Sequence, residues 1–530
     1  MNNSIFSFPL PENEPIKAYL PGSPELALLD KELERQTNTV VDIPLIIGGK
    51  RIHTENKGKV VMPHNHQHVL ATYSIAGPAE VQMAIDAAVA AKKEWEDLDW
   101  RVRSSIMLKT AELLAGKYRP RTNAATMLGQ SKNHFQAEID SACEAIDFLR
   151  YNVAYASQIY ARQPKCTPGV INSLEYRPLE GFVFALSPFN FTAIASNLNM
   201  SPVMMGNTTV WKPATTAILS NYYLMETFIE AGLPAGVVNF IPGSGAVLGK
   251  VIFSSPDFAG LHFTGSSGTF NNLWKSVADN LNTYKGYPRL IGETGGKDYI
   301  FVHESSDAER VAKLAFLGAF EFQGQKCSAA SRMYVPSNLW PEIKKSMVEM
   351  AANTKVGDIT KLDVLLGAVI DEKSFDNIAS YIEYAKESKD ASIVCGGTYD
   401  KSYGYFVDPT IIETTDPHFK SMEEEIFGPV LTVYVYDPSD LDQALDLLDS
   451  TSPFALTGAV FGNDRVAVDK ITQRLRYTAG NFYINDKPTG AVVGQQPFGG
   501  SRASGTNDKA GAELNLIRWT LPRTIKETLI

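Results

Sequence analysis

The stretch that decides the fold is GFVFALSPFNFTAIASNLNMSPVMMGNTTVWKP (181–213). Apolar runs rich in β-branched and aromatic residues open and close it, and a longer segment lies between them. Strand, helix and strand in this order predict a right-handed βαβ unit with parallel strands. The run from Gly181 to Trp211 holds no charge, yet its asparagines and prolines argue against a membrane span, because amides are costly in lipid and proline breaks helices. Such a buried helix either lines a pocket or is plain core.

The same alternation continues after this stretch. Strands are expected over 208–213, 236–243 and 258–265, with helices over 220–231, 246–253 and from 266 onward. GSGAVLG (243–249) and TGSSGTF (264–270) join strand to helix, and a helix N-terminus there favours a phosphate. Neither turn matches GxGxxG, so each alone fits a purely structural role. Two in consecutive units favour a nucleotide site at the carboxyl ends of the strands.

A second alternating block begins at RLIGETGGKDYIFVH (289–303) and runs to about residue 460, which predicts a second α/β domain. Elsewhere, helices are expected over 24–36, 78–98, 103–117, 136–159 and 307–322, and strands over 45–52 and 59–76. His64, His66 and His68 alternate within the last strand. No Cys or carboxylate flanks them closely, so solvent-facing histidines are expected rather than a metal site.

Composition excludes several classes of protein. A chain of 530 residues allows three or four domains and a large core. Its net charge of −10 opposes binding to nucleic acid, which needs clustered Lys and Arg. The four cysteines form no CxxC pair, and Cys143, Cys166 and Cys395 are expected to be small core residues. With no visible signal or transit peptide, we expect a cytoplasmic protein.

Cys327 is the candidate nucleophile. It lies in EFQGQKCSAASR (321–332), where small and polar residues follow a predicted helix. The neighbouring Lys326 is expected to lower the pKa of the thiol. Glu293, in GETGGK (292–297), is either an ordinary exposed carboxylate or, paired with a reactive thiol, a general base.

Five segments, in this order and spacing, resemble the aldehyde dehydrogenase superfamily: FTGSSGT, GETGGK, GQKCSAASR, EEIFGPV and QQPFGGSRASGTNDK. The resemblance covers nearly the whole chain. It implies an α/β fold with two parallel-sheet domains and a small β oligomerisation flap. The implied divisions are an NAD-binding domain (1–164 and 179–288), a catalytic domain (289–505) and the flap (165–178 and 506–530), the flap combining a hairpin with a C-terminal strand.

The resemblance assigns the chemistry to three residues. Cys327 is implied as the nucleophile that attacks the aldehyde carbon to give a thiohemiacetal. Asn190 resembles the oxyanion donor, which acts with the backbone N–H of Cys327. Hydride then passes to C4 of the nicotinamide, and Glu293 resembles the base that activates water to hydrolyse the thioester. The residue types suit the steps, since a thiolate attacks and leaves readily and a carboxylate of raised pKa can deprotonate water.

The implied cofactor is NAD. Nine positions resemble the family's NAD-binding residues: Ser187, Lys212, Gly265, Ser266, Ser267, Gly268, Thr269, Glu425 and Phe427. The first two match contacts to the adenosine portion, the next five match the loop near the pyrophosphate, and Glu425 matches the carboxylate that holds the nicotinamide ribose. Thr215 stands where many NAD-selective members carry Glu. A carboxylate there would repel a 2′-phosphate, so NADP use stays open.

Within the superfamily, SPFNFTAI (187–194) and NDKPTGAVVGQQPFGG (485–500) resemble the 1-pyrroline-5-carboxylate dehydrogenases, which oxidise L-glutamate γ-semialdehyde to glutamate in proline catabolism. The resemblance implies these substrate-binding positions: Phe191, Ser328, Gly490, Ala491 and Phe498. Ser328 and the Gly490–Ala491 backbone would anchor the α-carboxylate and amine, and the two Phe rings would sandwich the methylene chain. Ala491 departs from members that carry Ser there, so a side-chain hydroxyl contact is lost.

Two other functions are considered: a different aldehyde dehydrogenase and a protein without catalytic activity. Another ω-semialdehyde dehydrogenase, such as one for succinate semialdehyde, would bind its carboxylate with Arg, but the anchor segment has none before Arg502. A catalytically silent protein on this fold predicts loss of Cys327 or Glu293, and both are present. The resemblance implies a homodimer or dimer-based oligomer and a proline dehydrogenase as a possible partner. No metal, membrane or nucleic-acid partner is expected.

Overall fold

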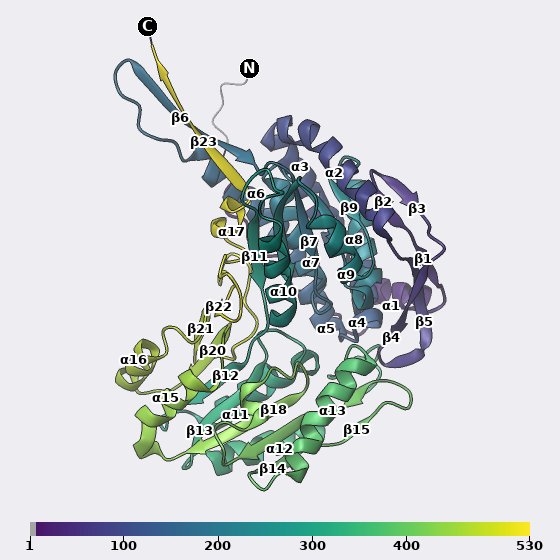
Figure 1. The fold of residues 1–530 in the computed structure, drawn as a ribbon. Helices are drawn as coiled ribbons and strands as arrows, with labels where there is room; N and C mark the ends of the chain where they lie inside the picture. The colour runs from purple at the N-terminus through teal and green to yellow at the C-terminus, as the bar shows by residue number, and fades with distance from the viewer. Residues whose placement is uncertain (1–6, 530) are drawn as a thin grey trace.

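The computed structural model describes residues 7–529. Two seven-stranded sheets, each covered by helices, form the body of the molecule. In Figure 1 the first sheet and its helices lie above the second, and a long two-stranded ribbon extends away from both at the upper left.

The first sheet is parallel along five strands and ends in an antiparallel hairpin. Its order is β11 (Arg289–Glu293), β10 (Phe258–Thr264), β7 (Phe182–Leu186), β8 (Thr208–Lys212), β9 (Val238–Phe240), β2 (Leu45–Ile47) and β3 (Lys50–Ile52). The expected single strand over 45–52 is therefore two strands. Gly48 and Gly49 turn between them with φ of 56° and 76°, the left-handed geometry that a two-residue hairpin turn requires.

Helices cover both faces of this sheet because its central strands are apolar on both sides. One face packs against α2 (Pro78–Asp97), α9 (Gly245–Ile252) and α10 (Ser267–Asp279). The other packs against α3 (Trp100–Ala115), α4 (Arg119–Gln130), α6 (Glu144–Ala161), α7 (Thr192–Met204) and α8 (Ile218–Ala231). The uncharged stretch 181–211 thus forms β7, the buried helix α7 and β8. Over residues 7–529 no helix has the length and apolar character to cross a membrane.

The second sheet has one antiparallel edge strand, β14. Its order is β14 (Ala391–Cys395), β17 (Thr410–Thr414), β18 (Val430–Tyr436), β13 (Ala330–Pro336), β12 (Asp298–Val302), β20 (Thr457–Phe461) and β21 (Asn481–Ile484). In β12, Tyr299 and Phe301 enter one apolar cluster and Ile300 and Val302 the other, as the alternation of a strand dictates. The helices on these faces are α13 (Glu372–Glu387), α15 (Leu441–Thr451) and α16 (Arg465–Arg474) on one, and α11 (Ala308–Phe320) and α12 (Trp340–Asn353) on the other.

The segment 289–303, expected to open the second domain, is divided between the sheets. β11 pairs with β10 in the first sheet, and β12 pairs with β13 and β20 in the second. Both parts have an apolar centre, so the sequence pattern alone does not separate them. Glu293, the last residue of β11, consequently sits where the chain crosses from one sheet to the other.

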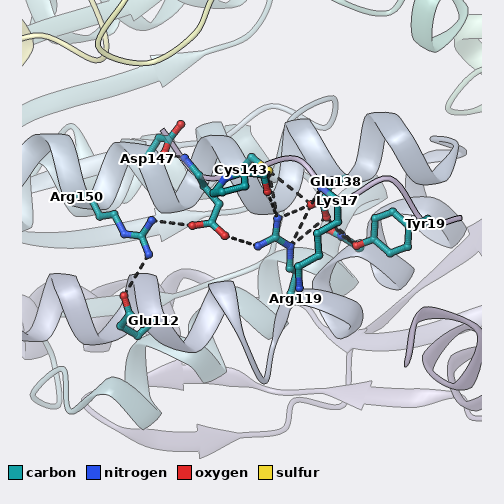
Figure 2. A network of polar contacts seen from close by, with 11 residues as sticks. Lys17, Tyr19, Glu112, Arg119, Glu138, Cys143, Asp147 and Arg150 are labelled. Carbon is teal, nitrogen blue, oxygen red and sulfur yellow. Dashed lines mark hydrogen bonds and ion pairs between the residues drawn. The ribbon is translucent and has the colours of Figure 1, made fainter. Parts of the chain in front are cut away.

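An N-terminal arm, residues 7–22, runs along the helices before α1 (Pro24–Thr37) begins. The helix expected over 136–159 is a composite of α5 (His134–Ala137), a π-helical turn η1 (Glu138–Cys143) and α6. Buried Arg119 pairs there with Glu138 and with Glu14 of the arm (Figure 2). Charges this deep need full pairing, so the arm is fastened by ion pairs as well as by packing.

The projecting ribbon pairs β6 (Val170–Pro178) with β23 (Thr520–Thr528) in antiparallel register from Thr520–Pro178 to Thr528–Val170. The expected hairpin over 165–178 is thus one long strand whose backbone groups are satisfied by β23. Cys166 precedes it and is exposed, which corrects its expected place in the core; Cys143 is buried and Cys395 partly buried.

The strand expected over 59–76 is also divided. β4 (Lys57–Met62) and β5 (Asn65–Ser74) form a hairpin that turns at Pro63 and His64, and β1 (Val41–Ile43) completes this small sheet. His64 is buried at 5% exposure beside Ser131, so the expectation that all three histidines face solvent is wrong for this one. Burial also lowers the pKa of His64 to about 4.

Candidate active site

Cys327 follows a tight turn at the end of α11. Phe322, Gln323 and Gly324 all have positive φ, between 50° and 64°. A Cβ on Gly324 would lie 2.2 Å from the carbonyl oxygen of Gly428, so this turn touches the segment that carries Glu425 and Phe427. The chain reversal needed to present Cys327 thus depends on a close backbone contact.

The electrostatic surroundings of Cys327 oppose ionisation. Burial raises the pKa of the thiol far above its ordinary value, and Asp298 and Glu293 raise it further. The expectation that Lys326 lowers this pKa is wrong, because the Lys326 ammonium pairs instead with Asp140 at 3.6 Å and Glu321 at 3.7 Å. The thiol therefore needs a base when it reacts.

Glu293 provides a carboxyl group beside this loop. Its Oε2 accepts a hydrogen bond from the backbone N–H of Gly500 at 3.3 Å, and a Cβ on Gly499 would lie 2.9 Å from its Oε1. Burial raises the pKa of Glu293 well above its usual value, and the Gly500 N–H and Lys509 offset this only in part. A carboxyl group tuned in this direction suits proton transfer near neutrality.

Asn190 and Phe191 directly precede α7 and lie next to the Cys327 loop. The Asn190 side-chain amide donates to the backbone carbonyl of Gln325 at 3.0 Å. The Phe191 ring stacks under the Lys132 ammonium, which lies 4.2 Å from its centroid. The structure therefore brings both residues, predicted from a segment 130 or more positions upstream, to the loop that carries Cys327.

A buried charge cluster next to this loop was missed by the sequence analysis. Lys132 donates to Asp140 at 2.5 Å, and Lys326 joins the same carboxylate. Burial, with Asp140 nearby, raises the pKa of Glu144 to about 8, whereas burial lowers the pKa of Lys132 to about 8. The only signal of this cluster in the sequence was a set of carboxylates in an otherwise apolar helix. In the structure these carboxylates lie at and after the π-helical turn, and π-helical turns are common at functional sites.

The predicted substrate anchor also reaches the nucleophile. The hydroxyls of Ser328 and Thr489 share a hydrogen bond of 2.8 Å, which places Gly490 and Ala491 just beyond the Cys327 loop. Phe498 pairs through its backbone with Ala510 and directly precedes Gly499, which approaches Glu293. The Phe191 ring lies against the Lys132 and Lys326 ammonium groups, 4.2 Å and 5.8 Å from its centroid.

The residues predicted for the cofactor form two groups. In the first, Ser266 caps α10 by accepting from the Thr269 N–H at 3.3 Å, and a Cβ on Gly268 would meet open space. Lys212 is nearby in the same sheet, bonded to the Pro213 carbonyl at 3.2 Å, and Ser187 lies on the adjacent strand end, where its N–H donates to the Lys212 carbonyl. Burial lowers the pKa of Lys212 to about 8.

In the second group, Glu425 accepts from the Gly296 N–H at 2.9 Å, and the Phe427 ring packs edge-on against Phe189. Gly296, Cys327, Glu425 and Phe427 line one shared cavity. A helix N-terminus, a buried ammonium and a buried carboxylate match the phosphates and hydroxyls of a dinucleotide. These residues therefore fit NAD. Over residues 7–529 no group of His, Cys, Asp and Glu is arranged to hold a metal ion.

Residues 52–525 match the profile of the Aldehyde dehydrogenase family. The chain belongs to this family. A delta-1-pyrroline-5-carboxylate dehydrogenase from Dictyostelium discoideum, named as mitochondrial, is 53% identical over 99% of the chain and 94% of its own length. The crystal structure of the Mycobacterium tuberculosis delta-pyrroline-5-carboxylate dehydrogenase bound with NAD superposes with a TM-score of 0.96, 47% identity and coverage of 100% of this chain and 98% of that one.

A third similar protein is proline utilization A from Bdellovibrio bacteriovorus, with a TM-score of 0.92 and 28% identity over 98% of this chain but only 53% of its own. The predicted aldehyde dehydrogenase fold is confirmed. The expected cytoplasmic location is contradicted, because the relative from Dictyostelium discoideum is named mitochondrial, as is one from Homo sapiens that is 48% identical. Cysteine usage alone does not distinguish these two compartments.

Proposed function

We propose that this aldehyde dehydrogenase uses NAD to oxidise L-glutamate γ-semialdehyde, formed by ring opening of 1-pyrroline-5-carboxylate, to L-glutamate in proline catabolism. The observation that carries the proposal is the full-length similarity to dehydrogenases of that name, together with a Cys, a Glu and an anchor loop at one site. Bound NAD supplies the hydride acceptor.

In the first step, the Cys327 sulfur attacks the aldehyde carbon. Because the pKa of the buried thiol is raised, its proton must leave as the C–S bond forms, and the Glu293 carboxylate, which is close enough to raise that pKa, is the base. Asn190 stabilises the oxyanion. One of its two amide hydrogens already bonds to Gln325, which orients the group and leaves the other for the oxygen. Such a donor is worth roughly 10²–10³ in rate.

In the second step, after the thiohemiacetal on Cys327 has lost its hydride to the bound nicotinamide to give a thioester, water hydrolyses that thioester. Glu293 takes the proton from this water, and its raised pKa improves its strength as a base at neutral pH. Aldehyde dehydrogenases without this carboxylate would transfer the acyl group elsewhere. The presence of Glu293 therefore favours a free acid as product.

Substrate recognition is assigned to the anchor loop. Ser328 and the backbone N–H groups of Gly490 and Ala491 hold the α-carboxylate and amine, and Phe191 and Phe498 enclose the methylene chain. No Arg lies between Thr489 and Arg502. This absence favours a backbone anchor over the Arg-based site expected for succinate semialdehyde.

We infer the remaining organisation from the fold. The first sheet and its helices bind NAD, and the second carries the nucleophile. The β6–β23 ribbon joins two copies of the chain, since Ile171 and Ile525 project from it exposed at 45% and 39%. Because the chain matches about half of a proline utilization A, another enzyme of proline use is a partner that could deliver the substrate.

The test compares substrates and cofactors on the purified protein. 1-Pyrroline-5-carboxylate with NAD should give glutamate, and the Cys327→Ala variant should lose this activity while binding NAD as before. A tenfold higher kcat/KM for succinate semialdehyde would refute the substrate assignment, and full turnover by Cys327→Ala would refute the nucleophile. Measuring NADP in parallel settles the question raised by Thr215.

A further inference from the structure

The N-terminal arm lies along the helices that back the active site. The Phe8 backbone N–H donates to the Ser157 hydroxyl at 3.2 Å, the Glu14 N–H donates to Asp147 at 2.7 Å, and the Lys17 N–H donates to Glu138 at 2.9 Å. From its N-terminal to its C-terminal end, the arm thus runs antiparallel to the helices, from α6 to the π-helical turn. Glu14 strengthens the contact by pairing with Arg119 and Arg150, as Figure 2 shows for these two arginines.

One residue of the arm also reaches the loop 489–496 that begins with the substrate anchor. The side chain of Asn13 donates to Asp147 Oδ2 on α6 and to the backbone carbonyl of Val493, both at 2.8 Å. Its Oδ1 accepts from Gln495 Nε2, also at 2.8 Å. The amide nitrogen and the carbonyl oxygen of Asn13 therefore both make hydrogen bonds, and these bonds join the arm to α6 and to the 489–496 loop.

Other contacts of the 489–496 loop show why the hydrogen bonds of Asn13 bear on the position of Gly490 and Ala491. At its start, Thr489 bonds to Ser328 beside the nucleophile. Farther on, Val493 packs against Phe148 and Tyr151 of α6. Gly490 and Ala491 lie between these two fixed points, so the direction of their backbone N–H groups depends on both ends of the loop.

We propose that Asn13 is a positioning residue for substrate binding, which holds the 489–496 loop against α6 and thereby aims the Gly490 and Ala491 amides at the substrate carboxylate. The inference rests on the proposed function, because it takes that loop as the anchor. The side chain of Asn13 is fully engaged by Asp147, Val493 and Gln495 and takes no part in the proposed chemistry. Its effect should therefore appear in KM for a carboxylate-bearing aldehyde and should leave the chemical step intact.

The experiment uses the full-length protein and the Asn13→Asp variant. Aspartate keeps the shape of asparagine but offers no N–H donor at neutral pH, and it places a second carboxylate against Asp147. KM for 1-pyrroline-5-carboxylate should rise about tenfold, the order expected from losing a partly buried hydrogen bond. The kcat, the KM for NAD and the kcat/KM for propanal, which lacks both carboxylate and amine, should stay within about twofold.

Two further variants complete the design. Gln495→Ala removes one bond to Asn13 from an exposed position, so it should fold and raise the same KM by a smaller factor. Glu14→Gln is the matched control: it weakens the neighbouring ion pairs of the arm without touching the loop, and should lower the melting temperature while leaving KM unchanged.

The outcomes separate two failures. If the unaltered protein does not oxidise 1-pyrroline-5-carboxylate, the proposed function is wrong and the inference falls with it. If it does, but Asn13→Asp and Gln495→Ala both keep its KM, only the positioning role is overturned. A loss shared equally by propanal, or reproduced by Glu14→Gln, also overturns it, because the arm would then act through general stability.

Discussion

Replacing Gly324 with alanine should disable the active site through a single methyl group. The added Cβ would lie 2.2 Å from the Gly428 carbonyl oxygen, whereas ordinary contact begins at 3.4 Å, so the two segments must separate by about 1.2 Å. One segment leads to Cys327 and the other follows Glu425 and Phe427. A misplacement of about 1 Å can cost roughly 10² in rate. Alanine at a φ of 64° adds about 1–2 kcal/mol of strain.

We therefore expect the kcat/KM of Gly324→Ala with 1-pyrroline-5-carboxylate to fall about 100-fold, with a raised KM for NAD. The assay is NADH absorbance under steady-state conditions, with circular dichroism to confirm the fold. Gly357→Ala is the matched control, because nothing lies within 4 Å of its added Cβ and its φ is not positive. If a folded Gly324→Ala protein kept more than a third of the original kcat/KM, the contact would not control the geometry of the nucleophile.

Three further predictions concern the base, the arm and the charge cluster. Because the pKa of Glu293 is raised and only its carboxylate form is a base, the rate of thioester hydrolysis should increase as pH rises through that pKa. In Glu293→Gln this pH dependence should vanish in single-turnover experiments that measure acylation separately. An unchanged pH dependence in the variant would exclude Glu293 as the base. Arg119→Met should lower the free energy of unfolding, measured by urea denaturation, by about 3–5 kcal/mol, because buried Glu138 loses its charged partner. Adding Glu138→Gln should restore part of this free energy, because the buried carboxylate is then removed. Lys132→Met should slow turnover by displacing Phe191, to which Lys132 is stacked, and a kcat/KM equal to that of the unaltered protein would show that the ring is held by other contacts.

Local patterns predicted most of the fold. The βαβ units after residue 181 follow from alternating apolar strands and helices, and Ser266 caps α10 where the Gly-rich turn indicated. The hairpin at Gly48–Gly49 and the separation of β11 from β12 were not predicted. In both cases the division falls within a short run that reads as one segment, and only the hydrogen bonding between strands shows where one strand ends and the next begins.

The candidate site was predictable where its residues lie in motifs, as do Cys327, Glu293 and Ser328. The electrostatics were not predictable, because they depend on pairs far apart in sequence. Lys326 adjoins Cys327 in sequence, yet its ammonium pairs with Asp140, 186 residues away. Asn13 and Gln495 are 482 residues apart, and no local pattern relates them.

The crossing of the chain between its two sheets has a consequence for how this enzyme should fail. Glu293 ends a strand of one sheet, while Cys327 is carried by the loop that leads into the other. The spacing between base and sulfur is therefore set by how firmly the two halves of the molecule are held together. Warming should loosen that junction before either half melts. An enzyme in this state would lack the base for both thiol attack and thioester hydrolysis, so heat should abolish activity before either half unfolds.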